Sequence, residues 1–463
     1  MEKTLLQVFR SAYRDLDLFP LLRPEDIQAF RVEYGSNTLV QLEQAVDDSP
    51  EDGKIVFSGH RGCGKSTLLA DFGKRMQQQG YFVVFFSISD MVEMSAVDHV
   101  NILYSIAVQL LSKASERQVT IPHKTKEEIL TWLSTTQTSA EVRDLKAQVG
   151  VGGDLLKVIT AKLQAESTFR EEIKRTYERR ITDLVKKIEE IARLIREATQ
   201  KQVLVVIDDL DKLDWKLVEE IYKNNINALF QPKLKIVFTI PIAVIRDIEL
   251  RTILRSESGE SIQQMEVAKF FSKADRHLRQ SPNLQKIEVF LEVLRRRFGE
   301  DWERAIAPDT AKKIVLLSGG VLRELVRIAR ECCRQCSLQL RQQPQLTDVK
   351  INDDILERAI REIRNEFSLS LGKRRYEILA TLYREAKPEE AIDDEFALLL
   401  HGLYVLEYRN DEVWYDVHPI VQELLRRENL IPPDPEPDPD PDPDPDPDPD
   451  PNPDSGEAAN AHA

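Results

Sequence analysis

The clearest hydrophobic pattern in the chain is a set of short segments in which apolar residues are continuous rather than alternating. They lie at residues 54–58, 81–87, 203–207 and 235–240, and residues 264–270 are a candidate for a fifth. Strands that are buried on both faces, as in a parallel sheet, have this continuous pattern. Helical patterns separate the segments, which predicts an α/β core built on a parallel sheet.

An amphipathic pattern runs from residue 169 to residue 201. Apolar residues recur there every three or four positions, and charged residues occupy the positions between them. This period predicts one long helix with a single apolar face. A partner helix in a coiled coil could cover that face, or the flank of the chain's own core could do so. The second interpretation is favoured, because such helices most often cover a core.

The chain beyond the last strand candidate is helical in pattern. Residues 283–365 carry helical periodicity, with a break at Gly319 and Gly320. One helix is predicted over residues 322–340, directly after this break.

A different order of elements closes the folded part of the chain. Two helices are predicted between residues 376 and 402, followed by a hairpin over 403–417 and a last helix over 420–427. Asn410 and Asp411 form the hairpin turn between aromatic and β-branched residues. Helices followed by a hairpin and a closing helix predict a winged-helix domain.

From Pro432 onward the chain alternates proline with acidic residues. This tail holds nine Asp, two Glu and no Lys or Arg, so it carries −11 of the net charge of −15 and leaves −4 for residues 1–431. Proline fixes the backbone and the aspartates repel one another, which predicts an extended and disordered tail. The acidity of the whole chain therefore neither favours nor excludes a nucleic-acid partner for the folded part.

The composition is that of a helix-rich globular protein. Hydrophobic residues make up 42% of the 463 residues. The longest apolar run, at 81–86, is far shorter than the roughly 18 residues that a membrane helix needs. The first residues do not resemble a signal peptide, and four cysteines do not make a disulfide framework. These features predict a cytoplasmic protein with no membrane partner.

One motif has a specific chemical meaning. Residues 59–66 read Gly-His-Arg-Gly-Cys-Gly-Lys-Ser, and they match the phosphate-loop pattern between a predicted strand and a predicted helix. Gly59, Gly62 and Gly64 let the backbone wrap closely, so that several amide groups converge on phosphate oxygens. The N-terminus of the following helix adds a positive end.

The first residues of that helix supply the side chains of the site. Lys65 would bridge the β- and γ-phosphates, and Ser66 would offer its hydroxyl to Mg²⁺. Thr67 follows as a further nucleotide-binding residue. ATP or ADP with Mg²⁺ is therefore the predicted ligand.

The third strand segment ends in two aspartates, which would place carboxylates at the sheet edge beside the phosphate loop. Asp208 would hold Mg²⁺ through water, and Asp209 would polarise the attacking water. Asp211 and Asp214 are nearby alternatives.

The order of these motifs resembles that of the additional-strand P-loop ATPases, in particular the AAA+ and STAND (signal-transduction ATPase) groups, over about residues 20–428. The resemblance implies a sheet with the strand order 5-1-4-3-2. It also implies that Thr239, which ends the fourth strand segment, is a polar sensor of the γ-phosphate or the water. An ordinary β-branched strand residue is the alternative for this position.

Residues 318–325 are similar to the second-sensor segment of AAA+ lids, above all in origin-recognition-type ATPases. That similarity implies that Arg323 reaches the nucleotide phosphates. Arg327, Arg330 and Arg334 continue the same helical face. We interpret them as a solvated basic face, with a nucleic-acid or subunit contact as the alternative.

Residues 415–422 resemble the winged-helix motif of STAND proteins, in which a histidine opening the last helix contacts the β-phosphate of ADP. The resemblance implies this contact for His418. A capping or packing histidine is the alternative. Arg251 and Arg255 are the candidates for an arginine finger.

The patterns divide the chain into five parts. They are an N-terminal helical, adenine-side segment (1–50), the ATPase core with a helical insertion at about 113–201 (51–280), a helical lid (281–365), the winged-helix domain (366–430) and the Pro-Asp tail (431–463).

These features predict a Mg²⁺-dependent ATPase that acts as a nucleotide-controlled switch and works through a protein partner or copies of itself. Turnover is expected to be slow, because Asp209 stands where the resembling families have a longer glutamate. The alternative is a DNA-binding ATPase that uses the winged helix, although the predicted hairpin has more acidic than basic residues. A binding scaffold without hydrolysis is a third possibility, against which the intact phosphate-loop and acidic residues count.

Overall fold

The computed structural model describes residues 3–134, 155–259, 262–388, 393–409 and 412–433. The contacts divide the chain into one unit over Met1–Pro432 and another over Pro433–Ala463. The predicted tail beyond residue 433 and the turn residues Asn410 and Asp411 lie outside the described residues.

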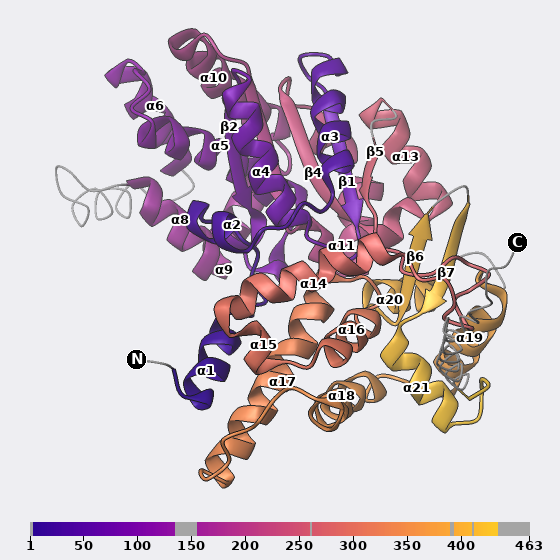
Figure 1. Ribbon diagram of the computed structural model, residues 1–463. Helices are drawn as coiled ribbons and strands as arrows, with labels where there is room; N and C mark the ends of the chain where they lie inside the picture. Colours follow the sequence, from indigo (N-terminus) through magenta and orange to yellow (C-terminus); the bar gives the residue numbers. More distant parts are fainter. Residues whose placement is uncertain (1–2, 135–154, 260–261, 389–392, 410–411, 434–463) are drawn as a thin grey trace, which may run out of the picture. The chain divides into compact units, whose positions relative to one another are not determined.

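Five parallel strands form the central sheet (Figure 1). In chain order they are β1 Lys54–Gly59, β2 Phe82–Ser87, β3 Val203–Asp208, β4 Lys235–Pro241 and β5 Ile262–Met265. Their order across the sheet is β2-β3-β4-β1-β5, and each pairing is parallel. The predicted order 5-1-4-3-2 is the same order read from the other edge, so it is confirmed.

Helices precede, connect and follow these strands. Up to β5 they are α1 Leu5–Asp15, α2 Pro24–Phe30, α3 Ser36–Asp48, α4 Lys65–Gln78, α5 His99–Glu116, α6 His123–Ser134, α8 Leu155–Ala165, α9 Ser167–Tyr177, α10 Ile181–Thr199, α11 Trp215–Val218, α12 Ile226–Phe230 and α13 Ile248–Ser258. After β5 follow α14 Leu284–Phe298, α15 Trp302–Ala305, α16 Pro308–Leu317, α17 Leu322–Gln342 and α18 Asp353–Ser368. Each helix among the described residues is too short or too polar to cross a bilayer.

Both faces of the sheet are buried, as the continuous apolar pattern predicts. Ile55 and Phe57 of β1 pack on one face, in a cluster with residues of α3 and α4. Val56 points to the opposite face, in the cluster that holds residues of α5 and α10. Burial on both faces explains why the strands are apolar throughout.

The single helix predicted over 169–201 is wrong in one respect. The structure has two helices, α9 and α10, which are separated at residues 178–180. Helix α9 packs on α5 and α8, with Tyr177 tilted against Tyr104 and Trp132, whereas α10 packs on α5 and β3. The chain turns between the two helices, although no glycine or proline interrupts the pattern; both helices share α5 as a neighbour, and only the second neighbour differs. Their apolar faces are buried, which supports the interpretation as the flank of the core.

The fifth strand is shorter than the predicted 264–270 and begins earlier. It pairs with β1 only as far as Met265, which lies opposite Gly59. The backbone N–H of Ala268 then donates to the carbonyl of Gly320 at 3.2 Å. This bond draws the chain away from the sheet and toward the start of α17.

The last described segment has the predicted order of elements. It consists of α19 Lys373–Glu385, α20 Asp394–His401, β6 Val405–Arg409, β7 Val413–Val417 and α21 Pro419–Arg427, and the two strands pair antiparallel. Trp414 is buried in the hairpin and stacks on Tyr408 with 4.6 Å between ring centroids. The Tyr408 hydroxyl donates to the carbonyl of Gly319 at 2.9 Å, so the hairpin is attached to the start of α17.

The close approach at Gly320 yields a stability prediction. Gly320 has a φ of +83°, and a Cβ there would lie 1.8 Å from the Ala268 carbonyl oxygen. Gly80 also has a positive φ, of +103°, but nothing lies within 4 Å of its Cβ position. Gly80→Ala should therefore cost only about 1 kcal/mol, from backbone strain. We expect Gly320→Ala to lower the free energy of unfolding by about 3 kcal/mol more, as measured by chemical denaturation. Equal losses in the two variants would contradict the contact.

Candidate nucleotide-binding site

The phosphate loop leaves β1 at Gly59 and enters α4 at Lys65. The Lys65 Nζ donates to the carbonyls of Gly59 and His60, at 2.9 and 2.8 Å. A third partner is the Asp211 Oδ2 at 2.7 Å. The loop therefore wraps around its own lysine and joins it to a carboxylate from beyond β3.

Lys65 and Asp211 form a buried ion pair, with side-chain exposures of 4% and 6%. Burial by itself would lower the pKa of Lys65, but the Asp211 carboxylate keeps that pKa above its ordinary value. Removal of either partner would leave a buried charge unpaired. The pair thus fastens the segment after β3 to the phosphate loop.

Three carboxylates gather at the end of β3. Oxygen atoms of Asp208, Asp209 and Asp211 lie within 4.8 Å of one another. Burial and the two neighbouring carboxylates raise the pKa of Asp208 to about 7, against a hydrogen bond with Ser66. The Asp208 Oδ1 is buried without a hydrogen-bond partner. This set of oxygens fits a divalent cation, whose charge would favour the ionised carboxylate.

Asp209 is engaged differently from the other two. Its Oδ2 accepts hydrogen bonds from the hydroxyls of Ser87 and Ser89, at 2.6 and 2.9 Å, and its Oδ1 lies 2.5 Å from the Lys212 Nζ. Burial opposes ionisation, but these partners hold the pKa of Asp209 below its ordinary value. Asp209 therefore bonds to Ser87, Ser89 and Lys212, whereas Asp211, the predicted alternative to Asp209, is the carboxylate that contacts Lys65.

Thr239 is fully buried at the end of β4. Its hydroxyl accepts from the Leu210 N–H at 3.0 Å and donates to the Ile207 carbonyl at 3.2 Å. Both bonds go to the backbone around the acidic residues. Thr239 therefore positions the segment that carries Asp208 and Asp211, and its contact with a phosphate stays a prediction.

Arg323 lies at the phosphate loop, and its contact with the nucleotide phosphates stays a prediction. Its backbone N–H donates to the Gly62 carbonyl at 3.0 Å. Gly62 has a φ of +77°, and a Cβ there would lie 2.5 Å from the Arg323 Cβ. Gly62 thus serves the contact between the loop and α17, in addition to its conformation in the loop.

A pocket of about 140 Å³ adjoins Lys65, Ser66 and Thr67. Its apolar side comes partly from the N-terminal segment, including Leu21, whose N–H bonds to the Thr67 hydroxyl at 3.1 Å. Ligand pockets are usually larger, about 300 Å³ or more. A nucleotide would therefore have to separate the surrounding elements on entry. The apolar lining residues are Leu18, Phe19, Pro20, Leu21, Phe30, Val32, Tyr34, Leu68, Met265, Val293, Leu322 and Val326.

His418 is not among the residues that line this pocket. It is fully buried, its ring centroid is 5.2 Å from that of Phe367, and its Nδ1 accepts from the Ile420 N–H at 3.3 Å. Burial lowers its pKa to about 3. This position fits the alternative of a capping and packing histidine, and contact with ADP would require α21 to move.

Two other histidines lie close to the phosphate loop and have no recognisable signal in the sequence. His60 occupies a variable position of the motif, and its Nε2 accepts the N–H of Glu407 at 2.8 Å. Burial lowers the pKa of His60 to about 4, so the ring is neutral, as this bond requires. Burial also lowers the pKa of His401 to about 4, with the charges of Arg61 and Asp211 close enough to contribute.

The Glu407 side chain extends the contact between the hairpin and the core. It is fully buried and forms a two-pronged ion pair with Arg246, which follows β4. The Gln264 amide of β5 donates to the same carboxylate at 2.8 Å. Strands β4, β5 and β6 are thus joined beside the phosphate loop through one acidic residue.

The other predicted arginines lie away from this pocket. Arg327 pairs with Glu324 and Glu366, and Arg334 pairs with Glu331. Arg327 and Arg334 are therefore neutralised by neighbouring glutamates, whereas the prediction of a solvated basic face did not include ion pairs. Arg251 and Arg255 are exposed on α13, so they make no contact with the site in this chain.

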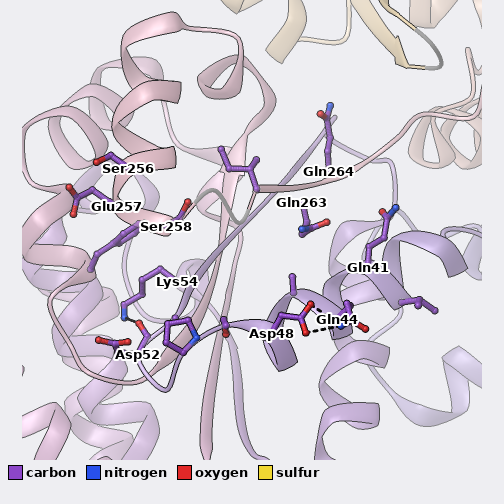
Figure 2. Close-up of a pocket in the computed structure, with 18 of the residues that line it drawn as sticks. Gln41, Gln44, Asp48, Asp52, Lys54, Ser256, Glu257, Ser258, Gln263 and Gln264 are labelled. Carbon is purple, nitrogen blue, oxygen red and sulfur yellow. Dashed lines mark hydrogen bonds between the residues drawn. The ribbon is translucent and has the colours of Figure 1, made fainter.

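A larger hollow lies elsewhere, beside the edge strand β5 (Figure 2). Its volume is about 1370 Å³, and it contains none of the predicted site residues. Its labelled side chains come from α3, α13, β5, the first residue of β1 and the segment before β1, and the Gln44 amide bonds to Asp48 at 2.8 Å. The chemistry described above therefore belongs to the smaller pocket.

A family model for the KAP family P-loop domain matches residues 38–286. The chain belongs to this family. The match and the order of the sheet confirm the predicted P-loop NTPase. No curated protein matches the KAP family chain described here.

Solved structures of distant similarity cover most of the chain. Thermotoga maritima RuvB T158V has 13% identity and a TM-score of 0.35 over 89% of this chain and 99% of that chain. The Aeropyrum pernix ORC1 protein in complex with DNA has 12% identity and a TM-score of 0.38, over 88% and 96%. Drosophila ORC bound to DNA has 11% identity and a TM-score of 0.36, over 91% and 92%. Nothing about activity or partners follows from likenesses this distant.

The buried pair at Lys65 yields the second prediction. Asp211→Asn leaves the Lys65 ammonium buried without a carboxylate, so the free energy of unfolding should fall by about 3–5 kcal/mol. Asp214→Asn is the matched control, because Asp214 is exposed and caps α11 without a side-chain hydrogen bond. It should change stability by less than about 0.5 kcal/mol. Denaturant titration measures both, and a small loss in Asp211→Asn would refute the pairing.

Proposed function

We propose that the chain is a Mg²⁺-dependent ATPase that acts as a nucleotide-controlled switch. One observation carries the proposal: two late elements of the chain bond directly to phosphate-loop residues. Helix α17 bonds Gly62 through the Arg323 N–H, and β6 bonds His60 through the Glu407 N–H. Any shift of the loop backbone on nucleotide binding would therefore displace both α17 and β6.

The charges around Lys65 give the switch its physical basis. In the conformation described, Asp211 neutralises Lys65. A nucleotide would compete for Lys65 with its own phosphates, and like-charge repulsion would push Asp211 away. The segment after β3 would then move, and the small pocket would open between the N-terminal segment and α17. ATP and ADP would differ in how far this opening goes.

Ser66 and Asp208 are the residues that would hold Mg²⁺, which would neutralise charge on the transferred phosphate. Asp209 or Asp211 would polarise the attacking water. Asp209 has a low pKa and three partners, while Asp211 lies beside Lys65. We also propose that residues 366–430 form a winged-helix domain, as in STAND proteins, and that His418 contacts ADP in another conformation.

A protein partner or a second copy of the chain would bind in a way that depends on the position of α17 and the hairpin. The contacts of the hairpin give little support to the alternative, a DNA-binding ATPase that uses the hairpin, because two of its charged residues already bond within the chain. Glu407 is buried against Arg246, and Arg409 bonds Gln264 at 2.7 Å. Stimulation of turnover by duplex DNA that is lost in Arg409→Ala, which removes the one cation of the hairpin, would favour that alternative.

Lys65→Ala tests nucleotide binding. Loss of a charge that reaches the phosphates should weaken ATP binding by about 3 kcal/mol, which is roughly 100-fold. Lys74→Ala, at an exposed position of the same helix, is the control and should bind ATP normally. Isothermal titration with Mg-ATP measures both affinities. Equal affinities in the two variants would remove the basis of the proposed function.

Glu407→Gln tests the switch. The substitution keeps the shape of the side chain but removes the charge that pairs with Arg246, so the hairpin should leave the phosphate loop more readily. We expect release of a fluorescent ADP analogue to become about tenfold faster, which corresponds to about 1.4 kcal/mol. Glu412→Gln is the matched control, because the partners of this hairpin carboxylate among the described residues are the surface lysines Lys273 and Lys387. An unchanged release rate in Glu407→Gln would mean that the hairpin does not control the nucleotide.

A further inference from the structure

A second feature of the molecule, remote from the phosphate loop, is a groove between α1 and α17. The two helices pack along each other through buried side chains, among them Phe9 and Cys336 (Figure 1). The groove has a volume of about 570 Å³. Its lining residues include no acid and consist of Gln7, Arg10, Tyr13, Arg14, Arg334, Ser337, Leu338 and Arg341.

Three of the four arginines in this α1/α17 groove are unneutralised. Arg10, Arg14 and Arg341 are exposed, and none has a carboxylate within 4.0 Å in the described part of the chain. Arg334 is bound by Glu331 at 2.6 Å. Elsewhere on α17 the cation Arg327 is also paired. The arginines without an ion pair in the groove therefore come from both helices, Arg10 and Arg14 from α1 and Arg341 from α17.

The floor of the groove is partly apolar. Leu338 is 39% exposed, and Tyr13 lies beneath the Arg330 guanidinium, which is 4.4 Å from the ring centroid. Arginine presents a planar fork of donors that binds two phosphate oxygens at once. Because Arg330 already covers the Tyr13 ring, the groove offers its exposed arginine donors, and not an open aromatic face, to a polynucleotide.

We propose that the α1/α17 groove binds the phosphate backbone of a nucleic acid. The argument rests on charge: residues 1–431 carry a net −4, yet this groove is lined by three exposed arginines that have no ion pair among the described residues, and by no acidic residue. All of its cations are arginines, and the groove lies open along two helices, which suits a long polyanion. The proposal does not depend on nucleotide hydrolysis, and it places nucleic acid away from the predicted winged helix.

The test is salt-dependent binding of the full chain to a short fluorescein-labelled duplex DNA, measured by anisotropy without nucleotide. Each phosphate contact contributes about 0.9 to the slope of log affinity against log salt. The variant Arg10→Ala/Arg14→Ala/Arg341→Ala should therefore lose about 2.7 of that slope and bind at least about tenfold more weakly at about 50 mM salt. The matching lysine variant, which keeps the charges, should retain most of the slope.

The control removes three exposed cations from other elements, as Arg175→Ala/Lys201→Ala/Lys216→Ala. Its affinity should stay close to that of the unaltered chain. The proposal is overturned if the groove variant binds as before or if the control loses as much affinity. It is also overturned, in favour of an acidic protein partner, if labelled polyglutamate binds the groove more tightly than the duplex. None of these three results affects the Lys65→Ala test of nucleotide binding.

Discussion

The buried ammonium of Lys65 is the constraint on which the rest of the site depends. A charge with 4% side-chain exposure is tolerable only if its donors are satisfied and a counter-charge is near. Two loop carbonyls meet the first need, and Asp211 meets the second. The segment after β3 must therefore lie against the phosphate loop, and Thr239 holds that segment in place through Leu210.

The same loop is also where the two halves of the chain meet. Gly62 accepts from the backbone of α17, and His60 accepts from the backbone of β6. A neutral histidine is required for the second bond, and burial supplies it by lowering the pKa to about 4. The Arg246–Glu407 pair then fixes the hairpin to the strand ends of the core. The loop is thus bonded to both α17 and the hairpin, which is the basis of the proposed switch. Helix α17 begins at the loop and ends in the α1/α17 groove, so the two sites share one rigid element.

Most of the core and half of the site could be predicted because their signals are local. A few consecutive residues are enough to predict each of three features: the strands buried on both faces, the glycines of the phosphate loop and the aspartate that ends β3. The errors arose where packing overrides periodicity. The pattern over 169–201 continues unbroken, but α9 and α10 are separate helices that share α5 and differ in their second neighbour. The fifth strand ends at Met265 because Ala268 bonds to Gly320 instead of to the sheet.

The sequence by itself determined that this is a P-loop NTPase with a five-stranded parallel sheet, since that information lies in short contiguous motifs. Only the tertiary structure decided which of several candidate side chains meet at the loop. Asp209 has a φ of +69°, and its carboxylate meets Ser87 and Ser89 while Asp211 meets Lys65. His60, and not His418, joins the loop to the C-terminal hairpin. These outcomes depend on contacts between residues as much as 347 positions apart, and no local pattern encodes such pairings.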